Sequence, residues 1–258
     1  MPLGLKDAIS TPLFSFGDKL RILGEPFRPK GKNPNESLAS FVKRRMGQSF
    51  LDYAIDPFIG GVYAGDPNYL TTRFAVPKIY ALEQTYGSLI GGSVKKPMKE
   101  KKTELEKRVS RKTFSMEGGL MNLTTALYES AGKDRFVLGA NNIQVQPADG
   151  GFLVTYENAS GEPLSIHTKK VISTTGAFAL EATMPFIDKE LLSKIDSLIY
   201  TKVIEVALGF NRWEGIKLDG FGGLIPSKEK RDILGVLYMS SLFEGRAPER
   251  GALPSVLS

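Results

Sequence analysis

Between residues 33 and 92, apolar side chains recur at intervals of three and four, which is the spacing of one face of an α-helix. We predict a first helix that begins at the Asn33 cap, has Pro34 in its first turn and exposes residues 43–45 to solvent. The last predicted helix ends at Gly91–Gly92. The apolar stripes of this region are Leu38, Phe41, Val42 and Met46, then Leu51, Ala54, Ile55 and Phe58, then Ile79, Leu82 and Leu89.

Residues 1–32 mix apolar side chains with Pro and Gly, so we predict short helices or turns there. Their apolar groups allow two interpretations. They can pack into the core, which we expect, or they can form an exposed patch that lies on a membrane.

The second part of the chain has a different pattern, in which short apolar runs alternate with Gly, Asn and Asp, as is typical of strands and turns. We predict helices over 115–127 and 188–198, and we interpret the run 171–175 as a buried strand. The change of pattern predicts two domains, a helical one at 1–112 and a mixed α and β one at 113–258. The predicted strands are Phe136–Leu138, Ile143–Gln146, Phe152–Tyr156, Leu164–Ser173, Val203–Phe210, Gly223–Pro226 and Ile233–Ser240.

The composition is that of a folded chain, because 41% of the 258 residues are hydrophobic and only 24% are charged. The net charge of +6 is compatible with nucleic acid, an anionic membrane, an acidic small molecule or simply a Lys-rich surface. Residues 95–112 are too polar to bury a core, so we expect a mobile surface connection. Because no aromatic residue is interleaved with these charges, nucleic-acid binding is not predicted.

The sequence gives no sign of a membrane span or a signal peptide. No apolar run approaches the roughly 18 residues that a span needs, and Met1–Ser10 lacks a basic start followed by an apolar run. We expect a cytoplasmic protein whose contact with a membrane, if it has one, is peripheral.

The residue types exclude several kinds of catalytic site. The chain has no Cys and a single His, so thiolate nucleophiles and His-rich metal sites are excluded. His167 lies in an alternating run and is interpreted as a surface strand residue. There is no G-x-G-x-x-G nucleotide fingerprint, and no pair of carboxylates to which acid and base roles can be assigned. We therefore predict no catalytic side chain and no metal, and the residues alone indicate only an α/β globular chain.

Three Gly fall within residues 60–65. We interpret this segment as a turn between helices, with a backbone that can approach a partner closely or adopt positive φ.

The run Phe58–Pro67 resembles the P-F-x-x-G-V-Y-A-G-D-P motif of the protoporphyrinogen oxidase family. Further similar blocks occur in the order of that family and cover nearly the whole chain, at 36–47, 82–92, 118–120, 220–226 and 234–248. The resemblance implies an α/β (α+β) fold of the FAD-dependent amine-oxidase superfamily. Such a fold has a helical, membrane-facing substrate lobe, a mixed-sheet substrate domain and an FAD domain that is incomplete in this chain.

The resemblance also implies a flavoenzyme of haem and porphyrin biosynthesis, which oxidises protoporphyrinogen IX to protoporphyrin IX with FAD and O₂. The implied partners are the porphyrinogen, O₂, a membrane surface and a second copy in a homodimer. Two alternatives stay open: coproporphyrinogen III as the substrate of the same chemistry, and a non-catalytic module that binds a tetrapyrrole or a membrane. The G-V-Y-A-G-D-P run argues against another superfamily member, such as an amine oxidase or a carotenoid desaturase.

Individual positions match the motifs of the family. Gly61 matches a glycine whose backbone lies beside the tetrapyrrole, and Leu224 and Leu237 match two apolar residues that sandwich the ring. Plain sheet core is the alternative interpretation of both Leu residues. The positions that fall where the superfamily packs backbone against FAD are Val145, Thr174, Thr175 and Gly176.

The sequence departs from the family pattern at both ends. The resemblance implies a central fragment, because the family begins with G-x-G-x-x-G and ends with a second flavin-contacting segment, and residues 249–258 do not resemble it. We expect this chain alone to bind FAD poorly and to have little or no oxidase activity.

Overall fold

The computed structural model describes residues 11–99, 103–108 and 114–258. Its contacts divide the chain into two compact units, Met1–Phe114 with Thr201–Ser258, and Ser115–Tyr200. The first unit thus takes in residues 201–258, which the sequence pattern had grouped with the second domain. The domain boundaries predicted from the sequence stay a prediction.

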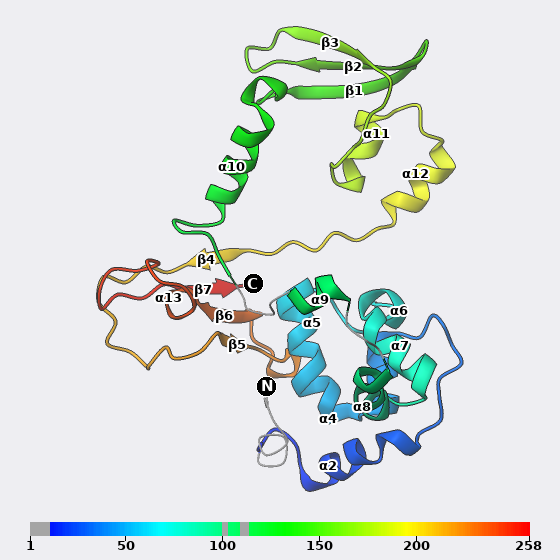
Figure 1. The fold of residues 1–258 in the computed structure, drawn as a ribbon, viewed down its shortest axis with the longest axis vertical. Helices are drawn as coiled ribbons and strands as arrows, with labels where there is room; N and C mark the ends of the chain where they lie inside the picture. Colours follow the sequence, from blue (N-terminus) through cyan, green and yellow to red (C-terminus); the bar gives the residue numbers. More distant parts are fainter. Residues whose placement is uncertain (1–10, 100–102, 109–113) are drawn as a thin grey trace. The chain divides into compact units, whose positions relative to one another are not determined.

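The first unit consists of helices and one small sheet (Figure 1). Three apolar stripes predicted helices, and all of these residues except Met46, the C-cap of α3, lie in helical elements. The core of these helices contains Leu38, Phe41, Val42, Leu51 and Ile59. The helical elements are α2 (Phe16–Leu23), the 3₁₀ turn η1 (Glu25–Phe27), α3 (Leu38–Arg45), α4 (Gln48–Phe50), the π-helical η2 (Leu51–Ile55), α5 (Asp56–Tyr63), α6 (Thr72–Ala75), α7 (Pro77–Tyr86), α8 (Leu89–Lys99) and α9 (Glu104–Arg108).

Two predicted helix ends were wrong. Helix α3 begins at Leu38, because the side chain of Ser37 accepts a 3.3 Å hydrogen bond from Ser40 N, as an N-cap does. Helix α8 runs through Gly91–Gly92 instead of ending there. A Cβ at Gly92 would lie 3.1 Å from Leu82 Cδ2, so this glycine allows α8 to lie close against α7.

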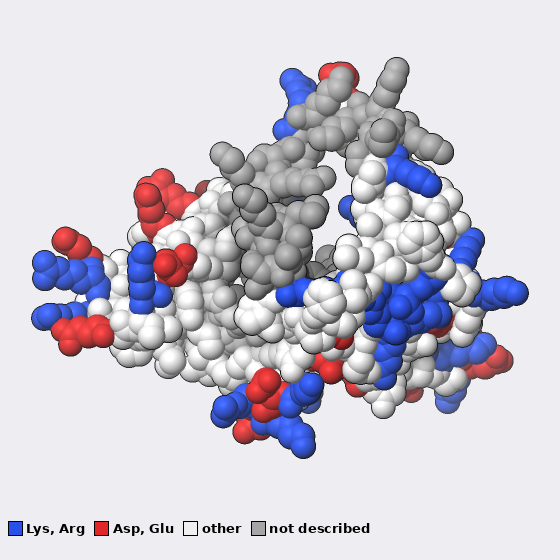
Figure 2. Space-filling model, turned by 90° about the horizontal axis from the view of Figure 1, so that it is seen from below, with Lys and Arg blue, Asp and Glu red and all other residues white. Residues whose placement is uncertain are grey.

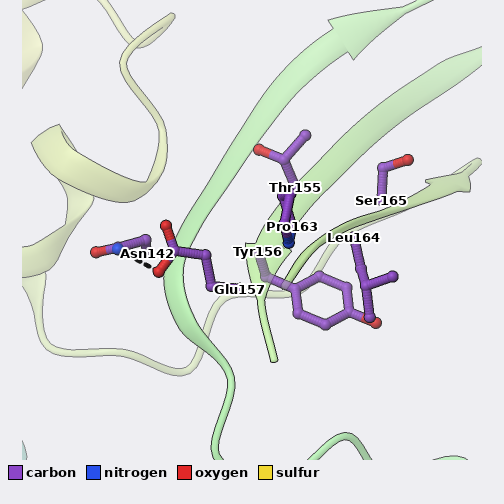
Figure 3. Close-up of a pocket in the computed structure, with 7 residues that line it drawn as sticks. All are labelled: Asn142, Thr155, Tyr156, Glu157, Pro163, Leu164 and Ser165. Atoms are coloured by element: carbon purple, nitrogen blue, oxygen red, sulfur yellow. Dashed lines mark hydrogen bonds between the residues drawn. The ribbon is translucent and has the colours of Figure 1, made fainter. Parts of the chain in front are cut away.

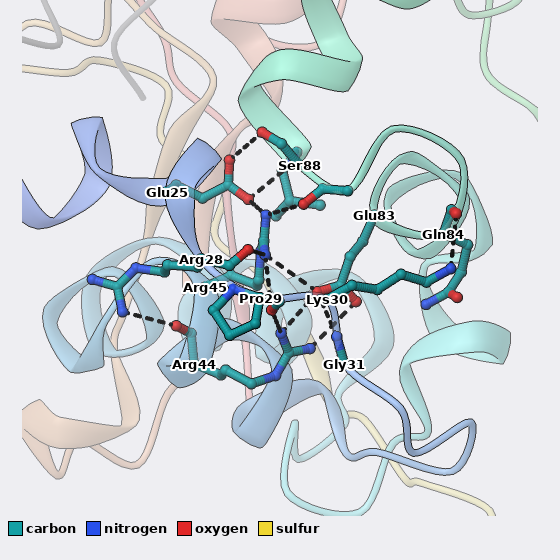
Figure 4. A network of polar contacts seen from close by, with 12 residues as sticks. Glu25, Arg28, Pro29, Lys30, Gly31, Arg44, Arg45, Glu83, Gln84 and Ser88 are labelled. Carbon is teal, nitrogen blue, oxygen red and sulfur yellow. Dashed lines mark hydrogen bonds and ion pairs between the residues drawn. The ribbon is translucent and has the colours of Figure 1, made fainter.

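The prediction that residues 43–45 form a solvated face was wrong for Arg45, whose side chain is fully buried (Figure 4). Arg45 pairs with buried Glu25 and donates 2.9 Å hydrogen bonds to the carbonyls of Arg28 and Gly87. The neighbouring Arg44 lies 2.7 Å from the buried carboxylate of Glu83. The buried charges are therefore paired, as burial requires.

Glu25 also caps helix α8. Its carboxylate accepts hydrogen bonds from Ser88 Oγ at 2.6 Å, Leu89 N at 2.9 Å and Ile90 N at 3.2 Å. These donors include two of the backbone N–H groups that a helix start leaves without a partner. The network around Glu25 thus joins η1, α3 and α8 into one lobe.

Apolar residues at the start of the described chain follow the expectation of core packing only in part. Phe14 is buried and stacks on Phe50 with ring centroids 5.8 Å apart. Helix α2, in contrast, has no buried residue. Its apolar face is open, with Phe16, Leu20 and Leu23 exposed by 77%, 53% and 69%, and Phe27, at the end of the following turn η1, is 91% exposed.

The sheet of the first unit is antiparallel, in the order β4-β7-β6-β5. Its strands are β4 (Glu205–Ala207), β5 (Gly222–Leu224), β6 (Gly235–Tyr238) and β7 (Pro254–Leu257). Two predicted strands contain β4 and β6, and a third overlaps β5, which begins one residue earlier than predicted; all three observed strands are shorter. Strand β6 ends because α13 (Met239–Leu242) follows at once, and a 3₁₀ turn, η5 (Ser227–Glu229), follows β5.

The second unit contains an antiparallel meander, β1-β2-β3, together with five helices or helical turns in its described residues. Strands β1 and β2 form a hairpin whose turn contains Gly150, where φ is +73°. This confirms the predicted alternation of strands and turns in this region. His167 lies exposed on β3 opposite Leu153, as predicted. The elements are α10 (Met121–Ala131), the 3₁₀ turn η3 (Lys133–Arg135), β1 (Asn141–Ala148), β2 (Gly151–Glu157), β3 (Pro163–Thr168), the 3₁₀ turn η4 (Ala177–Ala179), α11 (Leu180–Thr183) and α12 (Lys189–Asp196).

Two predicted strands are absent from the described second unit. Residues 136–138 form no strand, and the Phe136 ring lies 4.9 Å from that of Tyr128 on α10. Residues 171–175 are neither buried nor paired in a sheet, and Ile172 is 88% exposed. Apolar β-branched residues alone do not make a strand, because a strand also needs a neighbour for its backbone hydrogen bonds.

Candidate functional site

Gly61 lies in the last turns of helix α5. The prediction of a glycine turn at 60–65 was wrong for Gly60 and Gly61, which are helical, and α5 ends only at the left-handed cap Ala64, where φ is +46°. Positive φ therefore does not explain either glycine. The absence of a side chain at Gly61 instead allows another element to approach the helix closely.

The close approach is to strand β5 of the same unit. A Cβ at Gly61 would lie 3.0 Å from Leu224 Cδ1 and nearer still to Leu224 Cδ2. A Cβ at the adjacent Gly60 would lie 3.9 Å from Leu234 Cδ2, which is an ordinary contact. Helix α5 thus meets the sheet directly at Gly61, and Leu224 is the residue it meets.

Leu237 shares a sheet face with Leu224. Leu224 pairs with Gly235 and Leu237 pairs with Gly222 across the antiparallel strands β5 and β6. Paired residues lie on the same face, as do residues two apart along a strand. Gly222, Leu224, Gly235 and Leu237 therefore form one patch, in which each leucine has a residue without a side chain beside it.

This patch suits a flat apolar group. Leu224 and Leu237 are both half-buried, so part of each apolar side chain remains accessible to a ligand. The missing side chains at Gly222 and Gly235 keep the surface low between them. Sequence reasoning missed both glycines, although the same G-x-L spacing in 222–224 and 235–237 was a signal that could have found them.

Polar contacts hold the helix and the sheet beside this patch. The carboxylate of Asp56, in the first turn of α5, accepts hydrogen bonds from Ser227 N at 2.7 Å and from Ser227 Oγ at 2.9 Å. Lys228 Nζ lies 3.7 Å from Asp52 Oδ2 and 4.9 Å from the ring centroid of Tyr53. The pKa of Lys228 is raised, mainly by its contact with Tyr53 and less by the charge of Asp52, so Lys228 stays a cation.

The residues predicted to contact FAD belong to the second unit. Val145 is buried on β1, whereas Thr174 and Thr175 are exposed in the loop before η4. Gly176 ends that loop, and α11, which follows, packs against β1. The loop offers hydroxyl and backbone polar groups, which are of the kind that bind a nucleotide. The contact of Val145, Thr174, Thr175 and Gly176 with FAD stays a prediction.

Hollows elsewhere have other characters. One of about 350 Å³ lies on the meander, where Asn142 donates a 2.9 Å hydrogen bond to Glu157 beside Tyr156 and Leu164 (Figure 3). A larger one, of about 420 Å³, lies among the helices of the first unit, and fourteen of its fifteen lining residues are apolar. Neither is lined by the patch residues.

Charge and metal ligands add little to this picture. In the described residues, no group of three His, Asp or Glu side chains could hold a metal. Figure 2 shows basic and acidic side chains interspersed on one face, with a closer group of basic ones. Among the helices described, none has the length and apolar character to cross a bilayer.

Comparisons with known proteins agree with the resemblance. The chain is 31% identical to protoporphyrinogen oxidase 1, chloroplastic, of Spinacia oleracea over 96% of this chain and 47% of that protein. It is 29% identical to the protoporphyrinogen oxidase of Homo sapiens, over 98% of this chain and 53% of that protein. The chain thus spans about half the length of the curated relatives it matches.

Solved structures confirm the predicted fold class. A crystal structure from Exiguobacterium, of a protein assigned as a protoporphyrinogen oxidase, superposes with a TM-score of 0.73 at 19% identity and covers 96% of this chain and 52% of its own. Reduced UDP-galactopyranose mutase superposes with a TM-score of 0.62 at 15% identity, over 95% of this chain and 52% of its own. The family model described as "Flavin containing amine oxidoreductase" matches residues 1–258. The chain belongs to the flavin-containing amine oxidoreductase family, a family of oxidoreductases whose cofactor is FAD.

Proposed function

We propose that the protein to which this chain corresponds oxidises protoporphyrinogen IX to protoporphyrin IX, with FAD as cofactor and O₂ as final oxidant. The observation that carries the proposal is the Gly61–Leu224 contact beside Leu237, because three residues of separate motifs meet at one apolar patch. The relatives named protoporphyrinogen oxidase support the same substrate class.

The role of this chain is to bind and shield the ring. The reaction removes six electrons and six protons from the porphyrinogen, in three two-electron steps that consume three O₂ and give three H₂O₂. Flavin, when bound, supplies the hydride acceptor. Leu224 and Leu237 present a low apolar surface to the macrocycle, and the helical turn at Gly61 limits the space above it. No acid or base from the patch is required.

Binding of protoporphyrin IX tests the proposal without flavin. Titration of the porphyrin into the purified chain, followed by porphyrin fluorescence, gives the Kd. We expect Leu237→Ala to weaken binding about tenfold, from the loss of buried apolar area. The control is Val236→Ala, on the same strand but on the opposite sheet face. Equal effects of the two variants would contradict the proposal. Coproporphyrin III in a parallel titration tests the alternative substrate.

A second role, contact with a membrane surface, is favoured by the open face of helix α2. Phe16, Leu20 and Leu23 are spaced by four and three residues, so they lie on one side of the helix. An exposed apolar helix face of this kind suits the boundary between head groups and acyl chains. Co-sedimentation with anionic vesicles should fall in Phe16→Ser/Leu23→Ser relative to the wild type. Unchanged co-sedimentation of this variant would remove the support for this role.

The cellular compartment and the homodimer stay predictions. A cytoplasmic location was expected from the sequence, whereas plant relatives are named as chloroplastic or mitochondrial. A non-catalytic module that binds a tetrapyrrole is the remaining alternative, and it predicts porphyrin binding without turnover in the full protein.

A further inference from the structure

Helix α5 is held to the sheet at two places that are close together in the chain. One is the apolar contact of Gly61 with Leu224. The other is the pair of hydrogen bonds from Ser227 to the Asp56 carboxylate. Asp56 lies five residues before Gly61, and Ser227 lies three residues after Leu224.

The hydrogen bonds are of a strong kind. Both are donated to an ionised carboxylate, at 2.7 Å and 2.9 Å, and both come from a single residue. The donors are the N–H and hydroxyl of Ser227, the first residue of η5. Asp56 therefore acts as a cap for a 3₁₀ turn that is 171 residues away in the sequence.

A further polar contact to the η5 turn comes from the preceding helical turn. Asp52 lies four residues before Asp56, on the same side of the η2–α5 run, and it pairs with Lys228. The Lys228 ammonium also lies over the ring of Tyr53. The η5 turn is thus held by three side chains of one helical segment.

Two separated points fix the direction of a helix, whereas one point leaves it free to rotate. The Gly61–Leu224 contact alone would act as a pivot, because it rests on the flexible end of a leucine side chain. The Asp56–Ser227 bonds remove that freedom. The position of α5 against Leu224 is then fixed by Asp56 as well as by the apolar contact.

We infer that Asp56 is a positioning residue, which acts through Ser227 to hold helix α5 at the spacing that the ring-binding patch requires. This inference rests on the proposed function for the identity of the ligand, but the spacing itself can be tested without any ligand. Ser227 is its partner, and Asp52 and Lys228 reinforce it.

A disulfide reports the spacing directly, since the native chain has no Cys. In the double variant Gly61→Cys/Leu224→Cys, the new Cβ at 61 lies 3.2 Å from the place of Leu224 Cγ. Since a sulfur then takes the place of Leu224 Cγ, the two new thiols come close enough for disulfide formation to be tested. The rate at which oxidised glutathione forms this disulfide measures how often helix α5 and strand β5 are close enough for the two sulfurs to bond.

We expect Asp56→Ala in this double-cysteine background to slow closure about fivefold to tenfold, from the loss of two charge-assisted bonds at a solvent-accessible site. Asp56→Asn, which keeps one acceptor oxygen, should lie between. Glu229→Ala is the matched control, because it removes one negative charge from the η5 turn that Asp56 caps, and its carboxylate has no ion-pair partner in the described part of the chain. Closure as fast in Asp56→Ala as in the parent overturns the inference.

The affinity for protoporphyrin IX separates positioning from folding. With native residues at 61 and 224, Asp56→Ala should raise the Kd about fivefold or more while the melting temperature falls no more than in Ser227→Ala. A fall in melting temperature with unchanged Kd overturns the positioning role. Slower disulfide closure in a chain that binds no porphyrin would overturn the proposed function and leave the role of Asp56 in helix spacing supported.

Discussion

The side chain of Leu224 on β5 occupies the space that a side chain at position 61 of α5 would need. A Cβ at Gly61 would lie 3.2 Å from Leu224 Cγ and 3.0 Å from Cδ1. The neighbour Gly60 has ordinary space, since its nearest such contact is 3.9 Å away. A methyl group would therefore crowd Leu224 at position 61 but meet only an ordinary contact at position 60. Alanine substitutions at the two positions can be compared to test the site.

Gly61→Ala should weaken binding of protoporphyrin IX about tenfold, because the methyl group pushes Leu224 into the surface that faces the ring. Its effect on stability should be small. The gain in helix propensity, about 1 kcal/mol, offsets the crowding of a flexible side chain.

Gly60→Ala is the control for this prediction. It gains the same propensity without the crowding, so the chain should become slightly more stable and keep its affinity. Equal affinities of Gly60→Ala and Gly61→Ala would remove the special role of Gly61.

The buried pair of Arg45 and Glu25 should dominate the stability of the helical lobe. Both side chains are fully buried, so removal of one leaves the other charge without its partner. We expect Arg45→Met to lower the free energy of unfolding by about 3–5 kcal/mol. Urea titration followed by circular dichroism measures this change.

An exposed ion pair gives the comparison for Arg45. Arg212 and Glu214 lie 2.8 Å apart, with side chains exposed by 72% and 71%. Arg212→Met should change the unfolding free energy by less than about 1 kcal/mol. A loss at Arg45 no larger than that at Arg212 would show that the buried network does not hold the lobe.

Glu25 should make the stability of the lobe sensitive to acid. Burial raises the pKa of Glu25, but hydrogen bonds from Ser88, Leu89 N and Ile90 N, together with Arg45, outweigh burial and hold the pKa below its ordinary 4.5. A lowered folded-state pKa gives stability that is present above the ordinary value and is lost as the pH falls through the folded value.

The difference in unfolding free energy between the wild type and Glu25→Gln should therefore shrink as the pH falls below about 4.5. Urea titrations of both proteins between about pH 6 and pH 3 measure it. A constant difference over that range would mean that the ionised Glu25 does not stabilise the folded lobe.

Local patterns predicted much of the fold, for a physical reason. The stripe of Leu38, Phe41 and Val42 packs into the core because helix periodicity places these residues on one face. The hairpin of β1 and β2 was predicted because its turn residues are local to it. Such features depend on residues that are near one another in the sequence.

Long-range pairing was not predictable in this way. Arg45 lies on the apolar stripe of α3, three residues after Val42, and this was a signal that it is buried. Its partner Glu25, however, is 20 residues away, and the bond from Ser227 to Asp56 spans 171 residues. The Gly61–Leu224 site was expected from family motifs, whereas its glycine neighbours in the sheet depend on strand register, which the sequence alone did not supply.

FAD should bind weakly to this chain. The sequence has no G-x-G-x-x-G loop to hold the pyrophosphate, and Thr174 and Thr175 offer only exposed hydroxyls. After mixing with FAD and gel filtration, the protein peak should contain far less than one flavin per chain. Stoichiometric flavin with an ordinary flavin spectrum would contradict this expectation.

The most direct measurement is an NMR titration of the chain, labelled at its leucine methyl groups, with protoporphyrin IX. The ring current of a porphyrin strongly shifts methyl groups that lie over its face. We predict large shifts for Leu224 and Leu237, and none for Leu38, which is buried in the helical core. Unshifted Leu224 and Leu237 methyl groups in a chain saturated with porphyrin would contradict the proposed binding patch.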